Sequence, residues 1–434
     1  MPPSLRAPRR SISVPTVFAP HRQRDAAERA AFPRLGLVVL AAAIFVSMST
    51  EFLPGGMLPD IAATFDRPVT QVGQLITVFA AAVILTTTPL AVATRRLPRK
   101  PLAVAGLIGI AFATACTALA PTFELLLAAR ALGGVTHGLF WAVAAAYAAD
   151  LVPASRLGRA TAITAAGGSL AGVLGIPLGN ALGQMWGWRA AFAALALCAA
   201  VIVVLLAALL PPVAGRRPSS AASSRTRAST MPRVLLLSGI ILLVVIGQTT
   251  FGTYSVVWLT EVATIPSPTI PLYLLATGAA AFIAVAAVGL VADRYPRASL
   301  LIAIALVAAL MAVFPIALAW GVPVLLAVAI TQSMAFAVVP MLLQAQMMRI
   351  AAPEQRSAAA ALQTTAFNIS IGGGAVVGAF VVGTWGLNAL PVISGSLTAV
   401  GLCVFLVSMR HVGARAPAPD ALGNPEARDV SVDV

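Results

Sequence analysis

Long apolar runs separated by short polar segments dominate the pattern of this chain. An α-helix needs about 20 mostly apolar residues to cross a bilayer, and twelve runs of that length can be marked. We predict membrane-spanning helices at 35–57, 70–92, 101–120, 124–147, 159–184, 188–211, 234–260, 268–292, 298–319, 322–348, 357–384 and 388–409. The chain is therefore predicted to be an all-α integral membrane protein.

Two polar segments between these runs repeat after about half the chain. The sequence RLPR at 96–99 recurs as RYPR at 294–297, and PASR at 153–156 recurs as PEQR at 353–356. Each copy lies between equivalent spans, which predicts two pseudo-symmetric six-helix bundles joined in tandem. Paired halves of this kind are the architecture of secondary transporters.

The repeat also divides the chain into domains. We predict an N-terminal bundle at 35–210 and a C-terminal bundle at 233–410, joined by a cytoplasmic linker at 211–232 that is rich in Pro, Ser and Arg. The tail at 1–34 is predicted to be disordered because it is rich in Arg, Pro and Ala, although an Arg-rich transit peptide would have a similar composition. A second cytoplasmic tail is predicted at 411–434.

Composition and charge support a membrane protein. Hydrophobic residues make up 59% of the chain, charged residues 10%, and the mean hydropathy is +0.95. The net charge is +14, but all Lys and Arg except Arg67, Arg130 and Arg189 lie in the tails, the linker and the loops on the same side of the membrane. This positive-inside pattern predicts that both termini are cytoplasmic. It argues against nucleic-acid binding and predicts contact with anionic lipids. We expect the chain to lie in the plasma membrane of a bacterium.

Residues that could support other chemistry are few. The three cysteines lie in apolar runs without disulfide or metal-ligand spacing. The spans contain no Ser/His/Asp set and no metal-binding cluster, so we predict neither an enzyme nor a cofactor. We expect a monomer whose partners are protons, lipids and a small-molecule substrate.

Glu51 is the acidic residue that stands out inside a span. Charged groups are costly in hydrocarbon, and a buried carboxyl there can take up and release a proton; a permanent ion pair is the alternative. In span four, Arg130, His137 and Trp141 follow one helical face. Pairing of Glu51 with Arg130 or His137 is geometrically plausible. We therefore predict that Glu51, Arg130 and His137 couple transport to protons.

Other candidates bind substrate or allow movement. Trp141 could stack on a ligand or simply pack in the core. Span five has glycines at four-residue spacing around a proline, which allows close helix packing, and we predict that Gly175, Pro177 and Gly179 also support rocking of the halves. In the second half, neutral polar residues could bind a ligand or hydrogen-bond neighbouring helices: Gln248, Tyr254, Trp258, Gln332, Gln344 and Asn368.

Several motifs together resemble the major facilitator superfamily, in its twelve-span drug:proton antiporter group, and in particular sugar-efflux transporters of the arabinose and thiogalactoside exporter type. The resemblance covers about 35–410 and rests on TEF at 50–52, LPDIA at 58–62, the segment 130–141, LGIPLG at 174–179, GWR at 187–189 and FNI at 367–369. It implies two bundles in alternating access. It also implies that Glu51 and His137 occupy positions tied to proton coupling and substrate recognition, that Arg130 is the fourth-span arginine and that Gly175–Gly179 form the antiporter motif.

One departure from the family pattern concerns the loop after span two. The family carries Gly-x-x-x-Asp-Arg-x-Gly-Arg there, whereas this chain has Arg95 at the position of the acid, followed by Arg96. The second half keeps the pattern, with Asp293 followed by Arg294. We therefore expect Asp293 to form the cytoplasmic gate, with Arg96 and Arg294 beside it.

The sequence thus predicts a proton-coupled antiporter that exports a small neutral or amphipathic solute, with sugars favoured. A phenicol-type multidrug exporter and a facilitator without ion coupling remain the alternatives. Direction and substrate rest on the resemblance alone.

Overall fold

A computed structural model describes residues 32–94, 96–152, 156–213, 230–292, 294–352 and 355–413. Within these ranges the chain forms helices and no strands, and twelve helical segments have the length and composition of membrane spans. Most of the predicted terminal tails and of the predicted linker lie outside the described residues, so those predictions stay untested.

The helices divide between two six-span halves. In the first half they are α2 (Arg34–Phe52), η1 (Leu53–Met57), α3 (Leu58–Phe65), α4 (Val69–Val72), α5 (Gln74–Ala93), α6 (Arg99–Leu119), α7 (Phe123–Leu151), α8 (Leu157–Leu170), η3 (Ala171–Gly175), α9 (Ile176–Trp186) and α10 (Trp188–Leu209). In the second half they are α11 (Met231–Glu261), η4 (Ser267–Thr269), α12 (Ile270–Ala292), α13 (Pro296–Ala319), α14 (Val322–Ile350), α15 (Arg356–Trp385), η6 (Leu387–Ala389) and α16 (Leu390–Gly413).

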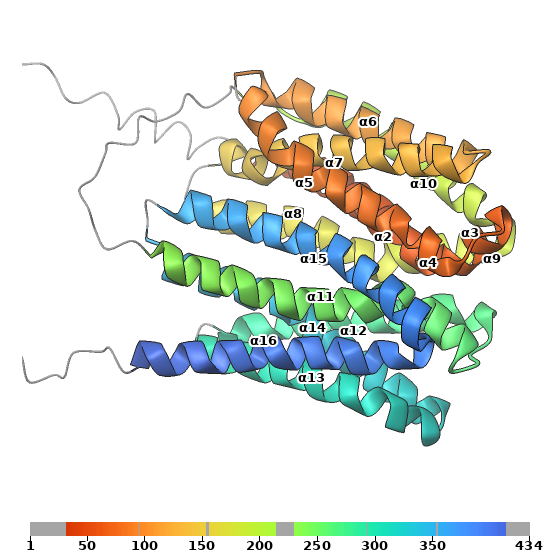
Figure 1. The fold of residues 1–434 in the computed structure, drawn as a ribbon. Coiled ribbons are helices and arrows are strands. Elements are labelled where there is room, and N and C mark those ends of the chain that lie inside the picture. The colour runs from red at the N-terminus through yellow and green to blue at the C-terminus, as the bar shows by residue number, and fades with distance from the viewer. Residues whose placement is uncertain are drawn as a thin grey trace, which may run out of the picture.

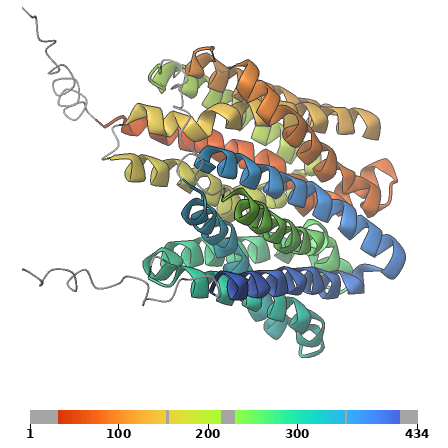
Figure 2. The same ribbon diagram turned by 60° about the vertical axis from the view of Figure 1, so that its left-hand side comes forward.

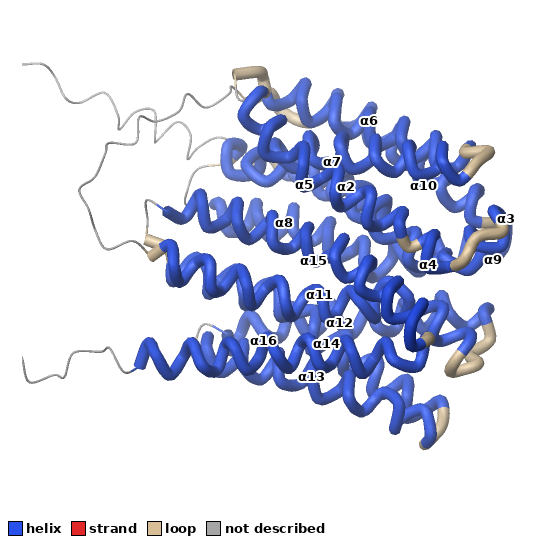
Figure 3. The backbone as a smooth tube through the Cα atoms, in the orientation of Figure 1, coloured by secondary structure: helices blue, strands red, loops and turns tan. Residues whose placement is uncertain are grey.

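The first half forms the upper part of Figure 1 and the second half the lower part. In the turned view of Figure 2, α2 begins and α16 ends on the same side of the molecule. We call this the terminal side and the other the opposite side. The short loops lie at these two ends of the helices (Figure 3), so the polar main chain between them is satisfied by helical hydrogen bonds, as a bilayer requires.

The first span is longer than predicted. The sequence predicted an end at residue 57, but the helix continues through η1 and α3 to Phe65. Pro54 and the following glycines loosen the helix into a 3-10 turn instead of ending it, because proline removes one main-chain donor without forcing the chain to turn back.

Three apolar cores show where the halves meet. One core, on the terminal side, belongs to the first half alone and includes Leu40, Phe140 and Leu206. A second, also on the terminal side, belongs to the second half alone. The third lies on the opposite side and combines residues of both halves, such as Met57 and Trp258. The halves are therefore packed together on the opposite side and have separate cores on the terminal side.

Specific contacts join the halves near and beyond the middle of the spans. The side-chain amide of Gln184 donates to the carbonyl oxygen of Ser267 at 2.7 Å, and the hydroxyl of Thr77 donates to that of Gly372 at 3.4 Å. Gly278 of α12 lies directly on the main chain of η3: a Cβ added there would lie 2.6 Å from the carbonyl oxygen of Gly172. This approach leaves no room for a side chain.

The substitution Gly278→Ala should therefore lower the thermal unfolding temperature of the purified protein, because the added methyl group meets main chain that cannot move aside, and overpacking of this kind costs about 1–3 kcal/mol. Gly289→Ala is the matched control on the same helix, since a Cβ there meets nothing within 4 Å. Equal unfolding temperatures for the two variants would contradict this account of the contact between the halves.

Candidate functional site

The main candidate site surrounds the end of α2, where the first span loosens. Glu51 lies in the last turn of α2, one residue before Phe52 and the 3-10 turn η1, and its residue is only 4% exposed. An ionised carboxylate at such a position needs partners. The structure supplies one from α7, and a residue of α2 holds that partner in turn.

His137 of α7 is the side chain that contacts the Glu51 carboxyl. Its Nε2 lies 3.5 Å from Oε2 of Glu51, within ion-pair distance but longer than an ordinary hydrogen bond. Its Nδ1 lies 3.0 Å from the hydroxyl oxygen of Ser47, a fully buried residue one helical turn before Glu51. The imidazole therefore bridges a carboxyl and a hydroxyl of the same helix.

Arg130 binds the main chain of the first span rather than the Glu51 carboxylate. Its guanidinium donates to the carbonyl oxygens of Thr50 at 2.8 Å and Glu51 at 3.2 Å, and its Nε donates to that of Leu75 at 3.4 Å. The Thr50 carbonyl needs this donor because its helical partner would be residue 54, which is proline and has no N–H. The sequence allowed the Glu51 carboxyl to pair with Arg130 or with His137, and in the structure its side-chain partner is His137.

Aromatic rings enclose the cluster. The Arg130 guanidinium lies 4.3 Å from the ring centroid of Phe79, and the same ring packs edge-on against His137 at 5.2 Å. Trp141 lies on the other side of His137, at 6.0 Å between ring centroids. Low polarity around these groups strengthens every electrostatic contact among them.

The charges of this cluster balance in one protonation state. With Glu51 ionised and His137 neutral, the anion offsets the buried cation of Arg130; one added proton gives the cluster a net positive charge. Burial of uncompensated charge is strongly unfavourable, so gain or loss of a proton here changes the energy of this part of the fold. The arrangement can bind one proton, and the resulting change in net charge alters the energy of this part of the fold.

Sequence reasoning missed two members of this cluster, Ser47 and Phe79. Ser47 lies four residues before Glu51 and so on the same helical face. This spacing alone does not identify a functional residue, because serine is common in apolar helices. Nothing in the local pattern separates Phe79 from the other apolar residues of α5.

Trp141 has an unsatisfied polar atom beside this cluster. Its residue is half-buried, yet its indole Nε1 is buried and finds no hydrogen-bond partner among the described residues. Buried N–H groups without partners are rare. The N–H lies on the terminal-side flank of His137, and a ligand would reach it only after the side chains around it move.

The polar residues predicted in the second half have different surroundings. Gln332 donates its amide to the Oε1 of Gln248 at 2.6 Å, which joins α14 to α11. Asn368 donates to the carbonyl oxygen of Thr364 within its own helix, and Gln344 is exposed. Among these amide side chains, the Gln248–Gln332 pair is the one whose printed hydrogen bond joins two helices.

Tyr254 and Trp258 lie in the apolar core shared by the two halves. The Tyr254 hydroxyl donates to the carbonyl oxygen of Ala375 at 3.2 Å, and Trp258 packs against Phe251 and Phe314. Both residues are at most 1% exposed. Neither is accessible to a ligand in this conformation, which argues against the prediction that they bind substrate. Spacing along the helix could not show that their face is closed.

The predicted gating residues of the fifth span face the first span. A Cβ added at Gly175 would meet the Ser49 side chain, and one at Gly179 would meet the Leu53 side chain. Pro177 follows η3, which is one turn of π-helix. These glycines allow contact within the first half, and η3 reaches the second half through Gly278.

The predicted loop residues are only partly described. Arg96 and Arg294 are exposed, with the Arg294 guanidinium 5.5 Å from the Tyr295 ring centroid. Asp293, to which we assigned the gate, lies outside the described residues. Over the described part of the chain no three His, Cys, Asp or Glu residues come close enough to hold a metal ion.

Comparison with known proteins agrees with this fold. Residues 40–287 match the family model of the Major Facilitator Superfamily. A chloramphenicol efflux pump of Mycobacterium tuberculosis is 34% identical over 359 residues, which are 80% of this chain and 86% of that protein. A probable sugar efflux transporter of Mannheimia succiniciproducens is 30% identical over 382 residues, which are 86% of this chain and 93% of that protein.

Solved structures share the fold at low sequence identity. The inward-facing, occupied form of a bacterial homologue of the human lysosomal transporter Spinster has a TM-score of 0.68 and 15% identity, over 89% of this chain and 99% of that one. The human organic anion transporter MFSD10 has a TM-score of 0.66 and 17% identity, over 87% and 100%. With two six-helix bundles, twelve spans and these matches, the chain belongs to the Major Facilitator Superfamily and is a multi-pass membrane transporter rather than an enzyme.

Proposed function

We propose that this transporter is a proton-coupled antiporter that exports a small neutral or amphipathic solute across the plasma membrane of a bacterium. The observation that carries the proposal is the buried contact of Glu51 with His137 and, through it, with Ser47. A carboxyl held by an imidazole, with the nearby Arg130 bound to main-chain carbonyls, can gain and lose a proton without breaking an ion pair to arginine. The efflux functions named for the two relatives support export.

The positive-inside pattern supports a cytoplasmic position for the terminal side. With that orientation, the halves are packed together on the outer side and have separate cores on the cytoplasmic side. This is the inward-facing arrangement of an alternating-access cycle, and the inward-facing Spinster homologue has the same fold. Substrate would enter from the cytoplasm, and release of a proton from Glu51 would accompany its binding.

The polar groups near the middle of the spans suit a neutral ligand. The Trp141 N–H is a donor without a partner among the described residues, and the Gln248–Gln332 pair contains both donors and acceptors. Sugars contain hydroxyl groups and chloramphenicol contains an amide, and both kinds of group can hydrogen-bond to these donors and acceptors. A panel that includes both kinds of compound therefore tests the substrate class directly.

The first test is Glu51→Gln in liposomes that contain a trapped pH-sensitive dye. Addition of sugars and of chloramphenicol to the parent protein should drive proton movement for at least one compound. Glu51→Gln should reduce that movement to the level of empty liposomes, because the amide cannot carry the proton. Glu124→Gln is the matched control, since its side chain is 70% exposed on the far end of α7. Substrate flux without proton movement, unchanged in Glu51→Gln, would instead establish a facilitator.

Ser47→Ala should shift the pH dependence of transport to lower pH. When the Glu51–His137 contact is kept, one added proton places a hydrogen on Nδ1, which then donates to the Ser47 hydroxyl; without the proton, Nδ1 accepts from it. Removal of the hydroxyl leaves a buried N–H unsatisfied only in the protonated state, and such groups are less tolerated than unsatisfied acceptors. Protonation therefore becomes less favourable.

The measurement for Ser47 is the pH at which substrate-driven proton flux is half-maximal. Ser47→Thr keeps a hydroxyl and should restore the parent profile. A profile of Ser47→Ala that is reduced in rate but not displaced along the pH axis would mean that the serine only packs.

Trp141→Phe should weaken substrate binding by about two- to tenfold, which corresponds to the loss of one neutral hydrogen bond. The phenyl ring keeps the packing on His137. Trp258→Phe is the control: its indole Nε1 also lacks a partner, but it lies in the closed core, so its dissociation constant should equal that of the parent. Titration of each purified variant with the transported compound measures the difference, and equal losses in both variants would remove Trp141 from the binding site.

A further inference from the structure

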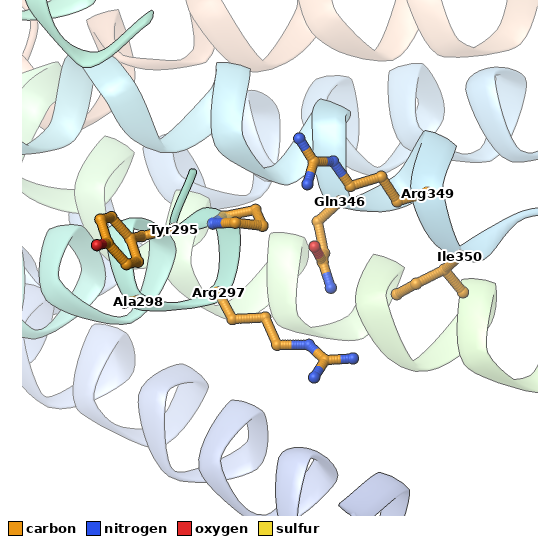
Figure 4. Close-up of a pocket in the computed structure, with 7 residues that line it drawn as sticks. Tyr295, Arg297, Ala298, Gln346, Arg349 and Ile350 are labelled. Carbon is orange, nitrogen blue, oxygen red and sulfur yellow. The ribbon is translucent and has the colours of Figure 1, made fainter. Parts of the chain in front are cut away.

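The two ends of the molecule differ in how the helices of the second half are packed. On the terminal side, a cavity of about 510 Å³ lies between the first turn of α13 and the last turns of α14 (Figure 4). On the opposite side the second half shares an apolar core with the first. Beside that core, a series of hydrogen bonds connects the segment after Glu51 to the second half.

The first of these bonds starts at η1, the 3-10 turn that follows Glu51. In a 3-10 helix the carbonyl oxygen of Gly56 would accept from the N–H of residue 59. That residue is Pro59, which has no N–H, and the next helix begins only at Leu58. The side-chain amide of Asn180 on α9 supplies a donor, because its Nδ2 donates to the Gly56 carbonyl oxygen. Asn180 is 2% exposed, so this bond is shielded from water.

The packing of η1 on α9 fixes the place of this bond. Gly56 has no Cβ, and an added one would lie 3.4 Å from the amide nitrogen that donates. On either side of it, Leu53 lies against Gly179 and Met57 lies against Gly183. These contacts follow four-residue spacing along both segments. The 3-10 turn is therefore held to α9 from its first residue to its last.

Gln184 continues the series from α9 to the second half. Its Nε2 donates to Oδ1 of Asn180 at 3.0 Å and to the carbonyl oxygen of Ser267 in η4 at 2.7 Å. A side-chain amide nitrogen has two hydrogens, so both bonds form at once. We call the series Gly56–Asn180–Gln184–Ser267 the amide bridge. It spans from the 3-10 turn beside Glu51 to the loop before α12.

The direction of each bond in the amide bridge depends on the one before it. The Gly56 carbonyl can only accept, so Asn180 presents its nitrogen to η1 and its oxygen to Gln184. That oxygen in turn holds the nitrogen of Gln184, which is thereby placed to donate to Ser267. A reversed Asn180 amide would set two acceptors against each other at Gly56 and two donors against each other at Gln184. The orientation of both amides is therefore determined at η1.

We propose that Asn180 is a positioning residue for closure of the opposite side. It orients Gln184 for the bond to Ser267, so that contact between the halves depends on the position of η1. A movement of η1 that withdraws the Gly56 carbonyl releases the Asn180 amide and weakens the bond between the halves. The amide bridge itself does not depend on protons, whereas a role of Glu51 in moving η1 rests on the proposed function.

The test measures how often the opposite side opens, through the alkylation rate of a buried cysteine. Val256 belongs to the core that the halves share and is 5% exposed. Val256→Cys is introduced into the full-length protein after Cys116, Cys198 and Cys403 have been replaced by alanine. The purified protein in detergent is then treated with a water-soluble maleimide. Because the buried cysteine reacts only when the core opens, its rate follows the population of the open state.

Asn180→Leu should raise the alkylation rate about two- to tenfold, the scale of one neutral hydrogen bond. Leucine keeps the branched shape of asparagine and removes the amide. Gln184→Leu should raise the rate by a similar factor, and the double variant should react no faster, because all three changes break the same bond to Ser267. A double variant whose effect equals the product of the single effects would show two independent contacts and would overturn the amide bridge.

Met185→Leu is the matched control, because Met185 follows Gln184, is 68% exposed and has no part in the amide bridge. It should react as the parent does. A parent-like rate of Asn180→Leu, beside a raised rate of Gln184→Leu, would confine Asn180 to packing within the first half and overturn its positioning role. If Asn180→Leu does not fold, Asn180→Ala removes the amide without added bulk and should raise the rate over the same range. The alkylation rate needs no proton flux, so a facilitator without antiport would give the same result as an antiporter.

Discussion

The binding of Arg130 to main-chain carbonyls is the interaction on which the candidate proton site depends. In a bidentate ion pair between the guanidinium and the Glu51 carboxylate, the acid would be a permanent counter-ion. Protonation of that acid would then leave a buried arginine without a partner. Instead Pro54 leaves the Thr50 carbonyl without its helical donor, and Arg130 supplies one. The carboxyl remains available to His137, so its charge can change while the arginine keeps its hydrogen bonds.

The two halves use the same scaffold with different polarity. In the first half, spans one and four meet through ionisable groups, Glu51 and His137. In the second half, spans seven and ten meet through two neutral amides, Gln248 and Gln332. In the proposed cycle only the first half responds to protons, and the second half can offer hydrogen bonds that do not change with pH. Such a division suits a neutral solute, because ligand contacts and proton chemistry do not compete for the same atoms.

Sequence reasoning located the spans, the repeat and the principal ionisable residues, because charge in hydrocarbon is costly enough to stand out. It did not foresee how Arg130 binds, although a proline four residues after Thr50 is visible in the sequence. Tyr254 and Trp258 were placed at the ligand because polar tips on an inner helix look alike whether their face is open or packed. That distinction depends on contacts between segments far apart in the sequence, such as Tyr254 with Ala375 and Trp258 with Phe314, which no local pattern contains.

The position of Glu51 gives a short physical route from protonation to conformation. The next segment of chain is η1, and its residues Leu53 and Met57 belong to the core that joins both halves on the opposite side. Gly55 of the same turn lies close enough to α11 that an added Cβ would be 3.9 Å from the Thr253 carbonyl oxygen. A charge gained or lost at Glu51 therefore acts within one turn on the segment that holds the halves together. A proton could bias alternating access here without any relay through the rest of the bundle.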